Sequence, residues 1–176
     1  MPSSHVALLR GINVTGKHVL PMKDLKAIFE SSGARHVSTY IQSGNVLFNA
    51  SPQAANAIAS KVQARIAADF GFTSPVVIRR TKDLRDLPSR NPFLPRVTDF
   101  SRLLVFFLER PSLVTTLDLL RFAPDEFVLS SPELFAYFPR GVGQSKFNNT
   151  HLEKQAGSSA TGRNWNTVLK LIELAQ

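Results

Sequence analysis

The chain has 176 residues and a formal net charge of +8. This length is enough for one domain or two small lobes, each with its own core. The absence of cysteine excludes disulfides, zinc–thiolate sites and cysteine nucleophiles. The basic balance, with a pI of about 10.3, favours anionic partners such as nucleic acid or phosphorylated metabolites, or else a solvated basic surface.

Membrane and export signals are not evident in the sequence. The first residues lack a basic segment followed by an apolar stretch, and no apolar run approaches the roughly 20 residues of a membrane span. We therefore expect a cytoplasmic protein without membrane partners. The sequence does not indicate an oligomeric state.

The first half predicts the order βαββαβ. The strands are expected at 5–11, 36–41, 45–48 and 75–80. One helix begins after Pro21 and stops at Gly33. A second begins at Pro52 and stops at Gly71, with an apolar stripe of Ile58, Val62, Ile66 and Phe70. This order is typical of a ferredoxin-like fold.

The second half predicts the order βαββαα. A connector with a short helix at 82–87 leads to a strand at 102–108. Pro111 opens a predicted helix carrying Leu113, Leu117 and Leu120, and a hairpin joins 126–129 to 134–138. Two more helices are predicted near 146–155 and 163–175. We expect an α+β protein with mostly antiparallel sheets, divided into a lobe at 1–81, a connector at 82–100 and a second lobe at 101–176.

Four segments together resemble those of one protein family. They are Leu8-Leu9-Arg10-Gly11-Ile12-Asn13-Val14, Thr39-Tyr40-Ile41-Gln42-Ser43-Gly44-Asn45-Val46, the Gly141–Lys146 loop, and Arg163-Asn164-Trp165-Asn166-Thr167-Val168. The chain resembles the DUF1697 family of small, mainly bacterial proteins. This resemblance implies a two-part α+β fold with a ferredoxin-like first half, and it implies no activity or cofactor. Thr15 and Gly162 depart from the family pattern, and the second departure leaves Thr161 as the expected helix N-cap.

Two polar segments near the C-terminus suggest anion binding. In the Gly141–Lys146 loop, Ser145 is expected to cap a helix and Lys146 to add a cation at its first turn. Arg163, Asn164 and Asn166 are expected to open the last helix in the same way, with Trp165 facing the core. The alternative for both segments is a capped turn whose polar groups bond locally or face water.

Two loops of the first half supply the other candidate ligand-binding residues. Arg10, Asn13 and Lys17 follow the first strand. Gln42, Ser43 and Asn45 surround the hairpin turn, where Ser43 has no sequence-local base and so is expected to serve the turn. The four histidines lack metal-ligand spacing, so we expect no metal site, and nothing predicts a cofactor.

These features favour a binding module for a phosphate-bearing ligand, with nucleic acid among the candidates. An RNP1 motif is absent, which argues against sequence-specific recognition of the RRM type. One alternative is an enzyme in which Arg10, Lys146 and Arg163 hold a small phosphorylated or acidic substrate. The other is that the motifs are structural and fasten the two lobes together.

Overall fold

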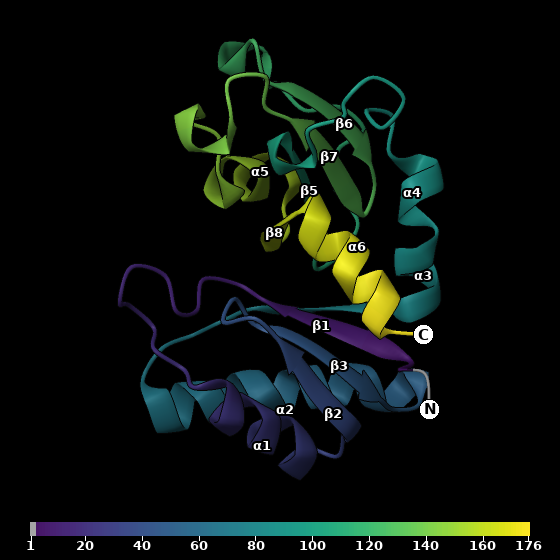
Figure 1. Ribbon diagram of the computed structural model, residues 1–176. Coiled ribbons are helices and arrows are strands. Elements are labelled where there is room, and N and C mark those ends of the chain that lie inside the picture. Colours follow the sequence, from purple (N-terminus) through teal and green to yellow (C-terminus); the bar gives the residue numbers. More distant parts are fainter. Residues whose placement is uncertain (1–2) are drawn as a thin grey trace. The chain divides into compact units, whose positions relative to one another are not determined.

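The computed structural model describes residues 3–176 (Figure 1). The chain divides into two compact units. The first extends to Leu84 and also includes Leu171–Gln176, and the second is Arg85–Lys170. Among the described residues, no helix is both long and apolar enough to cross a bilayer.

The first unit has the predicted ferredoxin-like order. Its elements are β1 (His5–Leu9), α1 (Met22–Ser31), β2 (Arg35–Tyr40), β3 (Asn45–Asn49), α2 (Pro52–Phe70), β4 (Val76–Arg80) and α3 (Thr81–Arg85), whose last residue is counted with the second unit. The strands form one sheet in the order β2-β3-β1-β4, and every neighbouring pair is antiparallel. Figure 1 shows α1 and α2 on the same face of this sheet.

Local sequence features determine both ends of α2. Ser51 caps α2, because its hydroxyl accepts a hydrogen bond from the Ala54 amide, and Pro52 occupies the first turn. Gly71 ends the helix in the left-handed conformation. The apolar faces of both helices pack on one side of the sheet, with Phe29, Ile58 and Val62 among the buried residues.

The second unit contains a sheet with the same pattern of strand pairing. Its elements are α4 (Leu87–Arg90), the short helix η1 (Phe100–Arg102), β5 (Leu103–Leu108), η2 (Leu120–Phe122), β6 (Glu126–Ser130), β7 (Glu133–Tyr137), η3 (Val142–Gln144), α5 (Asn149–Ala156), β8 (Ala160–Asn164) and α6 (Trp165–Leu174), whose end is counted with the first unit. The antiparallel order is β6-β7-β5-β8, which matches the first sheet position by position. The α+β class and the antiparallel sheets are confirmed.

The prediction of a helix after Pro111 is wrong. No α-helix lies between β5 and β6, and only the short η2 interrupts this segment. Only Leu117 of the apolar stripe packs against the core, since Leu113 is 81% exposed and Leu120 is 88% exposed. The Ser112 hydroxyl also bonds to the backbone of Val114, which offers this segment a local alternative to helical hydrogen bonds.

The predicted starts of the last two helices also need correction. α5 begins at Asn149, capped by the Asn148 side chain, so Lys146 precedes the helix. Arg163 lies in β8, where it pairs with Val105 of β5. Thr161 is likewise in β8 and caps nothing; the Asn164 carboxamide accepts from the Asn166 amide at the start of α6. Neither Lys146 nor Arg163 therefore occupies the first turn of a helix.

We predict that Gly44→Ala destabilises the first unit by about 2–4 kcal/mol. Gly44 has φ +78°, and an added Cβ would lie 2.8 Å from both Leu9 Cβ and Ile12 Cδ1, so backbone strain and overpacking add together. Urea unfolding followed by far-UV circular dichroism measures this loss. The matched control is Gly16→Ala, at φ +74° with nothing within 4 Å, which should cost only about 1–2 kcal/mol. Equal losses for both variants would contradict the packing argument.

Candidate anion-binding site

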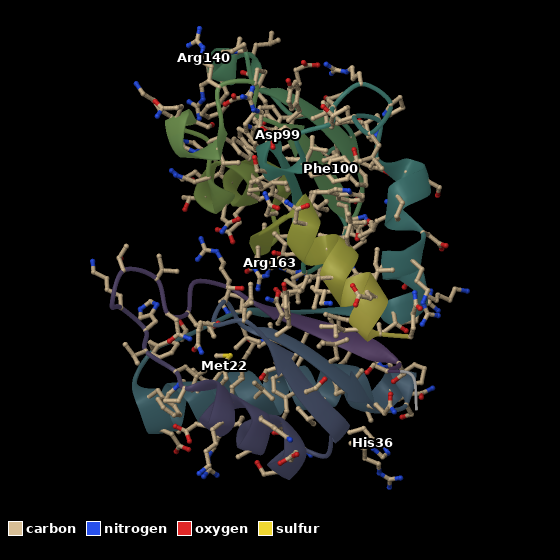
Figure 2. The ribbon with its side chains drawn as sticks, viewed as in Figure 1. Met22, His36, Asp99, Phe100, Arg140 and Arg163 are labelled. Carbon is tan, nitrogen blue, oxygen red and sulfur yellow. The ribbon has the colours of Figure 1, made fainter. Side chains whose placement is uncertain are left out.

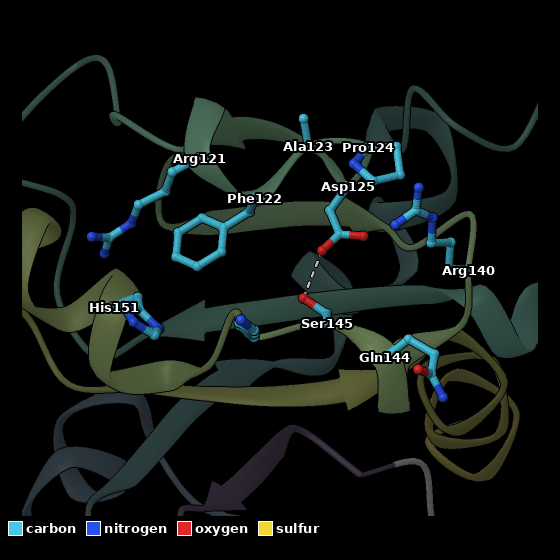
Figure 3. Close-up of a pocket in the computed structure, with 10 residues that line it drawn as sticks. Arg121, Phe122, Ala123, Pro124, Asp125, Arg140, Gln144, Ser145 and His151 are labelled. Atoms are coloured by element: carbon cyan, nitrogen blue, oxygen red, sulfur yellow. Dashed lines mark hydrogen bonds between the residues drawn. The ribbon is translucent and has the colours of Figure 1, made fainter.

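A cavity of about 470 Å³ lies within the second unit (Figure 3). Three segments line it: the turn at residues 121–125, the loop at 140–146, and the first turn of α5. Its lining residues are Arg121, Phe122, Ala123, Pro124, Asp125, Arg140, Gln144, Ser145, Lys146 and His151. Two of the residues proposed from the sequence, Ser145 and Lys146, are thus brought together with several cationic side chains.

A short hydrogen bond joins the two sides of this pocket. The Ser145 hydroxyl donates to Asp125 Oδ2 over 2.6 Å, as Figure 3 shows. The Ser145 hydroxyl oxygen also accepts a hydrogen bond from the Phe147 amide. Bonds to a charged group are stronger than neutral ones. Ser145 therefore connects the 121–125 turn to the 140–146 loop and fixes the backbone before Phe147.

An aromatic cluster beneath the pocket holds the same two segments. The buried ring of Phe147 lies 5.2 Å from that of Phe106 on β5, 5.2 Å from that of Phe122 and 4.5 Å from that of Phe127 on β6. Such pairs stabilise by about 0.5–1.5 kcal/mol each beyond the area that they bury. Burial of Phe147 thus anchors the loop that carries Ser145 and Lys146.

Three cations surround the cavity, against one carboxylate. Arg121 and Arg140 lie at opposite ends in Figure 3, with Asp125 and Ser145 between them, and Lys146 completes the set. In the described part of the chain, none of these three cations forms an ion pair. Other surface arginines do: Arg65, Arg80, Arg90, Arg96 and Arg102 each pair with a carboxylate. The pocket consequently carries a net positive charge, which Asp125 offsets only in part.

Two of the side chains that line the pocket contact the Phe122 ring. The Arg121 guanidinium lies 4.8 Å from the centre of the Phe122 ring, a cation–π contact that holds it beside the pocket. The His151 ring packs against the edge of Phe122 at 4.9 Å. Its Nδ1 atom is buried and makes no hydrogen bond within residues 3–176.

The six candidate residues of the first unit gather at one end of its sheet, where they hold the backbone. Asn13 donates to the carbonyls of Leu20 and Gln42 and accepts from the Leu20 amide. This single carboxamide fastens the loop after β1 to the β2–β3 turn. The fully buried Asn45 donates to the Tyr40 carbonyl and to the Ser43 hydroxyl.

The remaining members of this cluster contribute mainly through the backbone. The Arg10 carbonyl accepts a hydrogen bond from the Ser74 hydroxyl, and the Arg10 amide donates one to the Pro75 carbonyl. Lys17 closes a turn by donating its amide to the Val14 carbonyl, and its side chain is exposed. The hydrogen bonds described above therefore give Asn13, Ser43 and Asn45 a role in holding the local structure.

The C-terminal candidates lie apart from the pocket. Figure 2 labels Arg140 and Arg163 in separate regions of the second unit. Arg163 is buried, and it donates to the Thr161 hydroxyl over 2.7 Å and to the Gly162 carbonyl. Desolvation lowers the pKa of its guanidinium to about 10. Asn164 joins β8 to η1 by donating to the Ser101 carbonyl and also caps α6, and Trp165 is fully buried as expected.

Sequence reasoning missed Arg121, Asp125, Arg140 and His151. Arg140 directly precedes the Gly141–Lys146 loop, so its proximity to Lys146 was a usable signal. Asp125 lies 20 positions before Ser145, and no local pattern connects them. Only the folding of the 119–127 segment against Phe147 brings these residues together.

We predict that Ser145→Ala lowers the stability of the second unit by about 1–2 kcal/mol, because it removes a hydrogen bond to a carboxylate and leaves the Phe147 amide without its acceptor. Urea unfolding followed by fluorescence of Trp165, the single tryptophan, reports on this part of the chain. Ser60→Ala on the exposed face of α2 is the control and should change stability by less than about 0.5 kcal/mol. A loss no larger than that of the control would show that the Ser145–Asp125 bond does not hold the loop.

Comparisons with known proteins agree with this fold. No curated protein matches the chain significantly. A solved structure described as a conserved bacterial protein from Streptococcus pneumoniae is 20% identical, covers 100% of both chains and has a TM-score of 0.65, which indicates a shared fold. The family described as protein of unknown function (DUF1697) matches residues 3–135. The chain therefore belongs to the DUF1697 family.

Proposed function

We propose that this protein binds a small phosphate-bearing ligand in the pocket formed by residues 121–125, 140–146 and His151. One observation carries the proposal: three cations line a single cavity, and none of them forms an ion pair within the described residues. Guanidinium groups suit bidentate bonds to phosphate oxygens, and lysine adds a compact point charge.

The dimensions of the cavity favour a small molecule. Ligand pockets usually enclose about 300–1,000 Å³, and this one encloses about 470 Å³. Its cations are arranged around a concave space, whereas a strand of nucleic acid is usually held along an extended charged groove. Asp125 adds a hydrogen-bond acceptor, which suits a ligand with a hydroxyl or amine near its phosphate.

The expected affinity for a bare phosphate group is modest. If each of the three cations contributes about 1.4 kcal/mol, the dissociation constant is about 1 mM. A natural ligand must therefore gain further affinity from the rest of its structure. Pyrophosphate, which has two anionic groups, is a suitable first probe because it can reach cations at both ends of the pocket.

We predict that pyrophosphate binds with a dissociation constant of about 0.1–1 mM, and that Arg140→Gln and Lys146→Gln each weaken it about five- to tenfold. Isothermal titration calorimetry at low salt makes the measurement. Lys61→Gln, on an exposed face of α2, removes the same charge away from the pocket and should leave the constant unchanged. Equal affinity in all four proteins would contradict the proposal.

Single-stranded RNA provides the second arm of this experiment. Three phosphate contacts would give a log–log slope of affinity against salt of about −2, at about −0.7 for each contact. A small-molecule site predicts that Lys146→Gln leaves any RNA slope unchanged. A slope that flattens by about 0.7 in this variant would instead assign the pocket to nucleic acid.

A further inference from the structure

A second cavity of about 580 Å³ adjoins the cationic pocket, and Ala123 and Asp125 line both. We call it the apolar groove. Its walls come from the segment before β6, from β6 itself and from Leu134 of β7. The apolar residues that line it include Leu117, Leu119, Leu120, Phe127, Val128 and Leu129.

The groove exists because the second unit lacks one helix. In the first unit, α1 follows β1 and buries Leu25, Ile28 and Phe29 against the sheet. In the second unit, the corresponding connection after β5 contains only η2. Leu120, which lines the groove, is consequently 88% exposed. Neighbouring apolar side chains left in water favour a ligand that covers them.

The charges around the groove direct a ligand's anionic end towards the neighbouring pocket. Glu126 lines the groove and is paired with Arg96. Asp125, at the junction, accepts the bond from Ser145. On the other side of this junction lie Arg121, Arg140 and Lys146. The two cavities thus place unpaired positive charge next to apolar surface.

We infer that the pocket and the groove form one site for a soluble phosphate monoester with an apolar chain or ring. The phosphate group occupies the pocket lined by the three cations, and the apolar part lies along Leu120, Phe127 and Leu129. This inference rests on the proposed function and extends it to a ligand class. Burial of the ligand's apolar part would supply the affinity that a bare phosphate group lacks.

The experiment compares inorganic phosphate, butyl phosphate and hexyl phosphate, each below its micellar concentration. We expect affinity to rise about two- to fourfold for each methylene buried. The variant Leu120→Gln should remove much of this gain and leave the affinity for inorganic phosphate unchanged. Leu113→Gln is the matched control, because Leu113 is 81% exposed but does not line the groove. The substituted side chains are largely exposed, and Trp165 fluorescence verifies that each variant is folded.

The outcomes separate the inference from the proposed function. If phosphate binding depends on Lys146 but hexyl phosphate binds no more tightly, the groove takes no part and the inference is overturned. If hexyl phosphate and uncharged hexyl glucoside bind equally and Lys146→Gln affects neither, the proposed phosphate site fails. Vesicles of phosphatidylcholine with phosphatidic acid test whether the phosphate-bearing ligand is instead a membrane lipid. Cosedimentation that hexyl phosphate does not compete away would overturn the assignment to a soluble ligand.

Discussion

The burial of Phe147 is the contact on which the candidate site depends. Its ring packs among Phe106, Phe122 and Phe127, so that one side chain joins β5, the 119–127 segment and the loop before α5. The Ser145–Asp125 bond then fixes the polar layer above this cluster. Apolar packing thus positions the 121–125 turn and the 140–146 loop, which carry the three cations of the pocket.

The two sheets have the same strand order, yet their helical cover differs. The first sheet has α1 and α2 on one face, and its polar loop residues are largely engaged in holding the backbone. The second sheet lacks the counterpart of α1, which leaves an apolar groove beside a cationic pocket. We therefore place the proposed function in the unit that is less completely covered.

The first unit could be predicted almost entirely from the sequence. Pro52, Gly71 and the stripe from Ile58 to Ile66 specify α2 by local chemistry, and the short turn before Asn45 specifies a hairpin. The second unit follows its sequence pattern less closely. The Leu113–Leu120 stripe has helical spacing, but of its three leucines only Leu117 packs against the core. β8 reads Ala-Thr-Gly-Arg-Asn, which lacks the apolar alternation of a strand. Its pairing with β5 decides its conformation.

The candidate site was only partly visible in the sequence. Ser145 and Lys146 were recognisable from a glycine-bearing loop, although their role as a helix start was wrong. Arg121 and Asp125 come from a segment expected to follow a helix, and a pattern within one window cannot show that a distant turn folds onto the loop. Asn13 and Asn45 have the residue type of ligand-binding groups, but their side chains form hydrogen bonds with the backbone of nearby loops and, for Asn45, with the Ser43 hydroxyl.

The most direct measurement is a nitrogen-15 NMR titration of the whole protein with pyrophosphate. Our account predicts that the amide shifts concentrate at residues 121–125 and 140–147, with saturation at a common dissociation constant. The loop after β1 and the turn before Asn45 should remain unaffected. Shifts confined to those first-unit loops, or spread evenly over exposed lysines and arginines, would contradict the assignment of anion binding to the second unit.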